Sequence, residues 1–438
     1  MLRSMYSGVS GLRGYQTMID VVGNNIANVN TIGFKAGQTV FQDLLSQTLQ
    51  GAGLPAEGGG TNPAQIGLGM RLAGTTTSFG QGGLQNTGRS TDMSIQGDGF
   101  FVVRRDTNQF FTRAGSFTLD GNGRLATPQG TLVQGWTADA LGNINTNLDV
   151  ADILMPVGSL IDPQATTEVV VGGNLPASAP VSTPANPTLV SSAITVYDAN
   201  GAAKSLTFEY EKTAANRWEL KIKANGAYLQ NGGAPPVDAV WEFSFNAVNG
   251  TVAGIDATGA GTAGGATTTG SLVLTNAALA SFGDFDPATT ITVRFDQGEP
   301  LSQFSGINSL AARDQNGSAP GALQTFTISQ EGVITGVFSN GRTQNIAQIA
   351  IANFANPAGL EKLEGSMYRP TANSGLAQIG VAGIAGRGTL AGGTLEMSNV
   401  DLAQEFTNLI VAQRGFQAST RIITASDEVL NDLVNIRR

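Results

Sequence analysis

Large apolar residues recur at alternating spacings of four and three along the C-terminal segment, which holds no proline from Leu402 to Arg438. That spacing places them on one side of an α-helix. A helix of about 38 residues is about 57 Å long, several times the ~11–12 residues of an ordinary globular helix. We therefore expect the stripe to be buried against a partner. Its residues are Leu402, Phe406, Leu409, Phe416, Ile423, Leu430 and Val434.

A second apolar stripe follows the same C-terminal segment at intervals of seven residues, at Ile422, Val429 and Ile436. The N-terminal segment has a matching heptad pattern, which stops near Gly33. We predict that the two terminal helices pair as a coiled coil and that their stripes also form a seam for self-assembly. The N-terminal residues of this seam are Met5, Val9, Leu12, Ile19 and Ile26.

Four glycines interrupt the N-terminal helix, at Gly8, Gly11, Gly14 and Gly23. Each costs about 0.8–1.0 kcal/mol relative to alanine in a helix interior, so together they cost roughly 3–4 kcal/mol. The first 30 residues carry few charges, which indicates burial on several sides. We expect this helix to be poorly formed alone and both ends to fold on association.

The central part of the chain changes to a period of two. Trp218, Leu220 and Ile222 alternate with charged residues, as expected of half-buried antiparallel strands. Turn sequences such as Asp120 to Gly123 lie beside similar runs. The predicted fold is therefore multidomain α+β, with terminal helices and antiparallel β domains between them.

Composition excludes many kinds of chemistry. The chain has no histidine and no cysteine, which rules out Ser-His-Asp triads, thiol nucleophiles, zinc thiolates and disulfides. Its net charge of -9 argues against sequence-independent nucleic-acid binding. Asp120 and Asn122 begin like a calcium loop, but Arg124 stands where a ligand is needed, so a hairpin turn is favoured. We expect no catalytic site, no cofactor and no metal.

No run of 18 or more apolar residues occurs, so we expect no membrane span. The first 20 residues lack the apolar core of an ordinary secretory signal, so we expect the N-terminal segment to belong to the mature fold.

Motifs at both ends resemble those of the bacterial flagellar rod and hook proteins. The run from Gly23 to Lys35 is similar to the N-terminal signature of that family, and the runs 398–402 and 411–417 are similar to its C-terminal signature. Arg113 to Phe117 resembles part of its first β domain, and a large insertion from about Pro156 to Gly306 resembles its hook members. The signature residues are Asn24, Asn25, Ile26, Ala27, Asn28, Asn399, Asp401, Gln413 and Arg414.

The resemblance implies a nested domain order. It predicts an inner helical domain at 1–45 and 396–438, linkers at 46–71 and 391–395, a middle β domain at 72–153 and 307–390, and an outer β domain at 154–306. It also implies a function as a subunit of a curved, bendable, hollow tube that passes motor torque from rod to filament.

The implied partners are other copies of the chain, the distal rod protein, the hook cap, the hook–filament junction protein and the flagellar export apparatus. The implied location is the extracellular flagellar hook, reached by export without a cleaved signal peptide. Two alternatives stay open at this point: a distal rod subunit of the same family, and an extracellular β-rich adhesin that oligomerises through its terminal helices.

Overall fold

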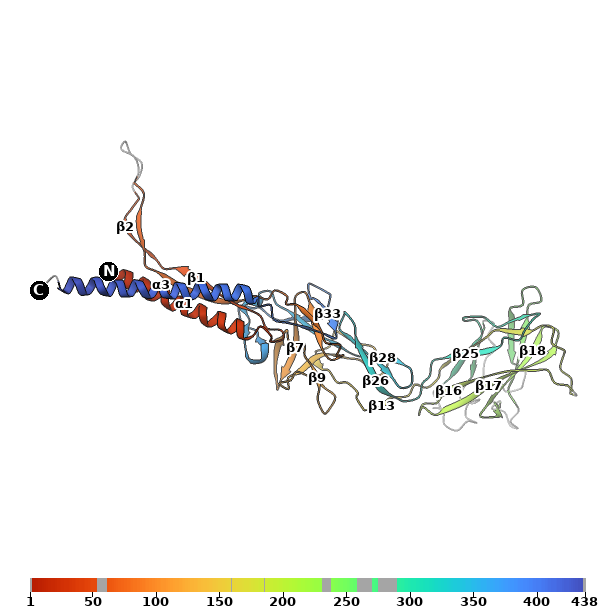
Figure 1. Ribbon diagram of the computed structural model, residues 1–438. Coiled ribbons are helices and arrows are strands. Elements are labelled where there is room, and N and C mark those ends of the chain that lie inside the picture. Colours follow the sequence, from red (N-terminus) through yellow and green to blue (C-terminus); the bar gives the residue numbers. More distant parts are fainter. Residues whose placement is uncertain are drawn as a thin grey trace. The chain divides into compact units, whose positions relative to one another are not determined.

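The computed structural model describes the chain except residues 1, 53–60, 159, 185, 231–237, 258–269, 275–289 and 436–438 (Figure 1). The chain divides into two compact units. The first unit holds residues 1–155, 326–336 and 344–438, and the second unit holds 156–325 and 337–343.

Two long helices from opposite ends of the sequence lie side by side in the first unit (Figure 1). They are α1 (Leu2–Ala27) and α3 (Leu402–Asn435). The helices run antiparallel, because Ser4 meets Ser426 while Asn25 meets Glu405. This arrangement confirms the predicted fold class, with paired terminal helices and β-sheets between them.

The β part of the first unit begins directly after α1. Its strands are β1 (Gly37–Asp43), β2 (Ser46–Gln50), β3 (Ala64–Gly67), β4 (Met70–Thr77), β5 (Leu84–Asn86), β6 (Met93–Gln96), β7 (Phe100–Arg105), β8 (Asn108–Thr112), β9 (Thr118–Leu119), β10 (Leu125–Ala126), β11 (Leu132–Thr137), β12 (Ala151–Asp152), β29 (Ile351–Asn353), β30 (Glu361–Lys362), β31 (Met367–Arg369), β32 (Gln378–Gly380), β33 (Thr389–Gly392) and β34 (Thr394–Glu396). Three strands have residues in both units: β26 (Gly321–Ile328), β27 (Val333–Phe338) and β28 (Thr343–Ile349).

Antiparallel pairs join the two ends of the chain in this unit. Strand β5 pairs with β34 and β6 pairs with β33, so strands from early and late in the sequence are neighbours. The segments expected to be linkers contain strands: 46–71 includes the β2–β3 pair, and 391–395 includes the end of β33 and the start of β34. The pairing explains this difference, because both segments find an antiparallel partner that their glycine-rich composition does not reveal.

An aromatic core fills the main sheet of the first unit, in which β28, β11, β7, β8, β31 and β30 are neighbours in that order. Phe100 and Phe111 both pack edge-on against Phe354, with ring centroids 5.8 Å and 4.8 Å apart. Tyr368 lies against Phe100 at 5.6 Å. These rings make the β part a packed scaffold for the helix pair.

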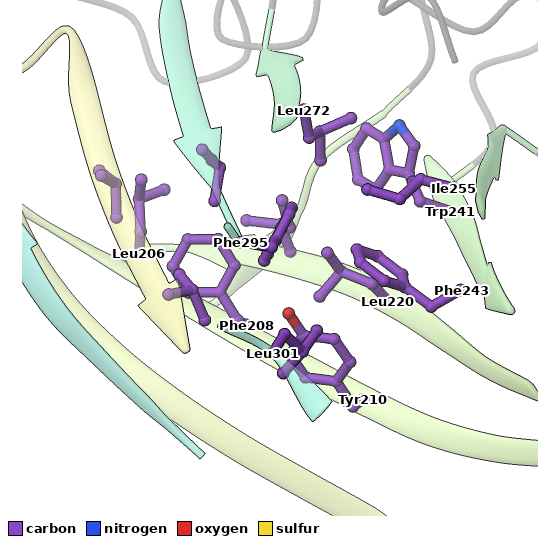
Figure 2. Packing of buried hydrophobic residues seen from close by; sticks show 14 of the residues in the cluster. Leu206, Phe208, Tyr210, Leu220, Trp241, Phe243, Ile255, Leu272, Phe295 and Leu301 are labelled. Atoms are coloured by element: carbon purple, nitrogen blue, oxygen red, sulfur yellow. The ribbon is translucent and has the colours of Figure 1, made fainter. Parts of the chain in front are cut away.

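The second unit is built from strands alone in the part that the structure describes. They are β13 (Leu160–Ile161), β14 (Glu168–Gly172), β15 (Asn174–Pro176), β16 (Leu189–Tyr197), β17 (Ala203–Ala214), β18 (Arg217–Ala224), β19 (Ala227–Tyr228), β20 (Val240–Phe245), β21 (Val252–Ala257), β22 (Ser271–Leu274), β23 (Ile291–Arg294), β24 (Ser302–Phe304) and β25 (Ala311–Gln315). The predicted alternation is confirmed in β18, where Trp218, Leu220 and Ile222 are fully buried. Figure 2 shows Tyr210, Phe243 and Phe295 turned into this core.

Most strand pairs of this unit are antiparallel, as expected, but β14–β23 and β15–β24 are parallel. Within the described residues, no helix is long and apolar enough to cross a membrane. No cluster of three or more acidic side chains that could hold a metal ion occurs there either.

Candidate self-assembly interface

Small residues line the contact between α1 and α3. The Oγ atoms of Ser4 and Ser426 are 3.3 Å apart, and a Cβ added to Gly11 would lie 2.9 Å from the Oγ of Ser419. Gly415 lies under the ring of Tyr15, where a Cβ would come within 2.5–2.7 Å of three ring carbons. The two backbones approach closely because these positions have little or no side chain.

The buried stripe of α3 has a strict seven-residue interval but is not made of large apolar residues. Glu405, Ala412, Ser419 and Ser426 are all less than 9% exposed. The seven-residue interval is that of a coiled-coil seam, at positions that the predicted apolar stripe does not include.

Three of the four glycines in α1 lie where a larger side chain would crowd a neighbouring residue. Gly8 and Gly11 face α3, and a Cβ on Gly14 would lie 2.8 Å from the Cε atom of Met70. A Cβ on Gly23 would meet nothing within 4 Å. At these three positions, close packing therefore explains why α1 contains glycine despite its low helix propensity.

The predicted seam residues lie beside the buried stripe. Leu402 and Phe406 are 41% and 51% exposed. The side chain of Val434 lies outside the described residues. The remaining members are half-buried: Met5, Val9, Leu12, Ile19, Ile26, Leu409, Phe416, Ile423 and Leu430. The chain alone leaves this seam incompletely covered, and its role in self-assembly stays a prediction.

Two apolar flanks remain open on opposite sides of the buried stripe of α3. At 100° per residue, the first flank and the second flank point away from each other. The first flank consists of Leu402, Phe406 and Ile410, and the second flank consists of Val411, Ile422 and Val429. Their exposed fractions range from 41% to 55%. The helix pair therefore offers apolar surface in two directions.

The asparagines of the N-terminal signature form hydrogen bonds at the C-terminal end of α1. The Asn25 Nδ2 atom donates to Glu405 Oε1 at 3.2 Å and to the carbonyl of Gly37 at 2.8 Å, and its Oδ1 accepts from the Gly37 N–H. The Asn28 amide donates to the carbonyl of Asn24 at 2.9 Å. Ile26 is half-buried and Ala27 is exposed at the last position of α1.

The C-terminal signature fixes the start of α3. Asn399 Oδ1 accepts from the Ala36 N–H at 2.8 Å, so it joins the segment before α3 to the segment after α1. Asp401 Oδ1 accepts from the Ala403 N–H at 2.9 Å and is the N-cap of α3. Ser398, three residues earlier, is not part of the cap, because α3 begins only at Leu402.

Gln413 and Arg414, the remaining signature residues, are exposed on α3. Their side chains lie on the outside of the intramolecular pair, so the contact between α1 and α3 does not explain them.

A buried ion cluster, which the sequence patterns do not reveal, lies at the base of the helix pair. Lys35 Nζ is 2.6 Å from Glu396 Oε1, and Arg113 Nη1 is 3.3 Å from Glu396 Oε2. These three side chains are at most 2% exposed. Burial lowers the pKa of both Lys35 and Arg113, and the Glu396 carboxylate opposes that shift.

Backbone groups complete this cluster. Lys35 Nζ donates to the carbonyl of Gly80 at 2.9 Å, and Glu396 Oε1 accepts from the Gly82 N–H at 2.9 Å. Arg113 Nη2 donates to the carbonyl of Gly97 at 2.7 Å. Lys35 and Arg113 lie within family-like motifs, but only the fold shows that both meet Glu396.

Four protein-family models match this sequence. The flagella basal body rod protein model matches residues 5–35, and the flagellar basal body rod FlgEFG protein C-terminal model matches 391–436. Between them, the flagellar hook protein FlgE/F/G D1 domain model matches 94–174 and the flagellar basal body protein FlaE D2 domain model matches 173–318.

Curated relatives match along their whole length. The flagellar hook protein FlgE of Treponema pallidum is 40% identical, with 100% of both chains covered. The flagellar hook protein FlgE of Borreliella burgdorferi is 38% identical with the same coverage. The flagellar basal-body rod protein FlgG of Bacillus subtilis is 30% identical, also over 100% of both chains.

Proposed function

This chain belongs to the flagellar hook protein family, and from that premise we propose that its copies assemble into a curved, bendable, hollow tube that carries motor torque from rod to filament. Membership makes the chain a structural subunit of the bacterial flagellar hook that polymerises with itself. Its cohesion, its bending and its further partners are inferred below.

The observation that carries the proposal is the pair of apolar flanks on α3. One open flank would favour a closed dimer, whereas two flanks that face different directions allow each helix pair to contact a neighbour on both sides. Contacts between different surfaces that do not close a ring generate an open helical polymer. The geometry of a single chain therefore fits a tube.

The flanks supply enough energy for cohesion. Full burial of a large apolar side chain is worth about 1.5–3 kcal/mol, so covering a half-exposed one adds about 1 kcal/mol. The two flanks hold six such residues, which gives on the order of 6 kcal/mol per subunit before the cost of ordering is subtracted. We propose that α1 and α3 pair only part of the time in the free chain and that this gain completes their ordering on assembly.

Circular dichroism of the chain before and after polymerisation tests that ordering step. We expect the helical signal to rise when the polymer forms, because the glycines of α1 weaken it alone. A soluble monomer with both helices already complete contradicts the ordering step while leaving the tube itself intact.

Bending requires outer contacts that exchange easily. Strands β17 and β18 of the second unit carry partly exposed ion pairs, among them Lys223–Glu209 at 2.6 Å and Lys221–Glu211 at 3.2 Å. Exposed pairs of this kind contribute about 0–1 kcal/mol, so no single arrangement is strongly favoured. We propose that outer surfaces slide past neighbouring copies while the helices hold the tube together.

We further propose the nested domain order of inner helices at 1–45 and 396–438, a middle β domain at 72–153 and 307–390, and an outer β domain at 154–306. The paired strands β5–β34 and β6–β33 support it, since they bring residues 84–96 beside residues 389–396, just ahead of α3. The proposed partners are the distal rod protein, the hook cap, the hook–filament junction protein and the export apparatus, at the extracellular hook.

The rod alternative has weaker support than the hook. The rod relative is 30% identical, against 40% and 38% for the two hook relatives. An adhesin is not favoured, because the family consists of structural flagellar proteins. We propose no catalytic role for the chain.

Deletion of the gene from its own bacterium, followed by electron microscopy and a swimming assay, tests the function. We expect loss of the curved segment with the rod still present, loss of motility, and recovery of both with the intact gene. Normal swimming contradicts the proposal, and loss of the rod supports the rod alternative.

A further inference from the structure

Three segments that are remote in sequence converge on the Glu396 carboxylate. Lys35 follows α1, Arg113 follows β8, and Glu396 is the last residue of β34, just ahead of α3. Lys35 and Glu396 are 361 positions apart, yet their charged atoms are 2.6 Å apart with no exposed surface. The cluster therefore exists only when both chain ends have reached the β part of the first unit.

Incomplete assembly of this cluster is strongly unfavourable. A buried ion without its partner loses its hydration and gains nothing in return, and breaking a buried pair costs far more than removing both partners together. Without Glu396, the cations of Lys35 and Arg113 would face each other away from water. Glu396 is therefore the key member of the cluster, because without it two buried cations have no carboxylate partner.

The cluster is tied to the bases of both helices. The Gly33 N–H donates to the carbonyl of Glu396 at 2.8 Å, and Asn399 bonds both Ala36 and the carbonyl of Ser78. Gly33 has a φ of +65°, and a Cβ there would lie 2.6 Å from the backbone nitrogen of Ala114. The segments after α1 and before α3 therefore have one well-defined docked position.

The same cluster is tied to the aromatic core. The Arg113 guanidinium lies over the ring of Phe100, 5.5 Å from its centroid, and Phe100 packs against Tyr368 and Phe354. Arg113 is in place only when the core around β7 and β8 has formed. This links the state of the sheet to the state of the two chain ends.

We infer that Lys35, Arg113 and Glu396 form a charge latch that makes the pairing of α1 with α3 conditional on a folded β part. The inference rests on the proposed hook function, for which the latch presents a correctly paired helix base to neighbouring copies. An unfolded or half-folded chain cannot hold the two helices together, so it does not offer both flanks for assembly.

The absence of cysteine from the chain allows a direct test in the soluble protein. Ser4→Cys with Ser426→Cys places two thiols at the far end of the helix pair, where the native hydroxyl oxygens are 3.3 Å apart. The rate of disulfide formation then reports how often the helices are paired. Glu396→Gln is added to this reporter, with Glu364→Gln as the matched control, because Glu364 forms an exposed pair with Arg105.

We expect Glu396→Gln to slow disulfide formation at least tenfold and Glu364→Gln to leave it unchanged. Lys35→Met is a second, milder variant that keeps the Arg113–Glu396 pair, and we expect it to slow the reaction as well. Hydrogen exchange of β7 and β8 is measured on the same samples and is expected to remain protected.

An unchanged rate in Glu396→Gln overturns the latch. Loss of hydrogen-exchange protection in β7 and β8 in both Glu396→Gln and Lys35→Met also overturns it. The three charges would then stabilise the sheet itself rather than the helix pairing. A failure of the hook function is distinguishable, because it would leave the difference between Glu396→Gln and Glu364→Gln in place.

Discussion

A pair of glycine substitutions tests the close contact between α1 and α3. Gly415→Ala and Gly23→Ala make the same chemical change within a helix. They differ in surroundings: a Cβ at Gly415 would lie 2.5–2.7 Å from three carbons of the Tyr15 ring, whereas a Cβ at Gly23 meets nothing within 4 Å. Any difference between the two variants therefore reports the helix contact.

The expected magnitudes follow from two opposing effects. Replacing glycine by alanine in a helix interior stabilises by about 0.8–1.0 kcal/mol, and Gly23→Ala should show this gain in full. Gly415→Ala must also displace the Tyr15 ring, and overpacking of this kind costs about 1–3 kcal/mol. We expect the free energy of unfolding of Gly415→Ala to lie about 1–3 kcal/mol below that of Gly23→Ala.

Urea denaturation of the purified chain, followed by the far-ultraviolet helical signal, measures both variants against the parent. The double variant Tyr15→Ala/Gly415→Ala removes the ring from the new methyl group, so the penalty of Gly415→Ala should largely disappear in that background. If Gly415→Ala stabilises the helices as much as Gly23→Ala does, the close contact in the structure is refuted.

Three further predictions concern assembly, capping and pH. Phe406→Ser should raise the critical concentration for polymerisation about fivefold to thirtyfold, for a loss of about 1–2 kcal/mol, while Gln417→Ser, an exposed polar control on α3, should not change it. Asp401→Ala should lower the stability of α3 by about 1 kcal/mol in denaturant titrations, because the N-cap is lost; no change would contradict the cap. The Arg124 N–H, with smaller contributions from the Arg124 side chain and the Asn122 N–H, holds the pKa of Asp120 below its usual value. The ionised Asp120 carboxylate should stabilise that turn fully at pH values above the pKa that Asp120 has in the unfolded chain. This stabilisation should be lost as the pH falls through the lower pKa of the folded chain. An Asp120 carboxyl that titrates in nuclear magnetic resonance at its ordinary pKa would contradict this.

The elements of the fold are predictable from local pattern. The heptad at 402–434 predicts a long C-terminal helix, and alternation around Trp218 predicts β18, because periodicity reflects which side of an element is buried. The turn at Asp120 to Gly123 is likewise local, with Asp120 Oδ1 accepting from the Asn122 N–H at 2.9 Å.

The residues at the centre of the helix contact are not predictable in the same way. Hydrophobic pattern selects Ile423, which lies 3.2 Å from a Cβ built on Gly8. It does not select Gly11 and Ser419, where a Cβ on Gly11 would lie 2.9 Å from the serine Oγ. Glycine and serine do not stand out in a hydrophobic pattern. Their role becomes visible only when the side chains of the partner helix that pack against them are known. The exposed flanks follow from the same fact, since a narrow contact leaves large neighbours partly uncovered.

The charge latch is beyond local prediction for a different reason. Glu396 stands among ordinary strand residues, and nothing within several positions indicates that it meets a cation. Its partners come from other segments, so the fold must be known before the charge can be assigned a role.

The most direct test of the account is a helical reconstruction of the assembled polymer by electron cryomicroscopy. We expect both flanks of α3, from Leu402 to Ile410 and from Val411 to Val429, to be buried against neighbouring copies along the inner tube. A polymer whose copies touch only through their β parts, with both flanks still open to solvent, would contradict it.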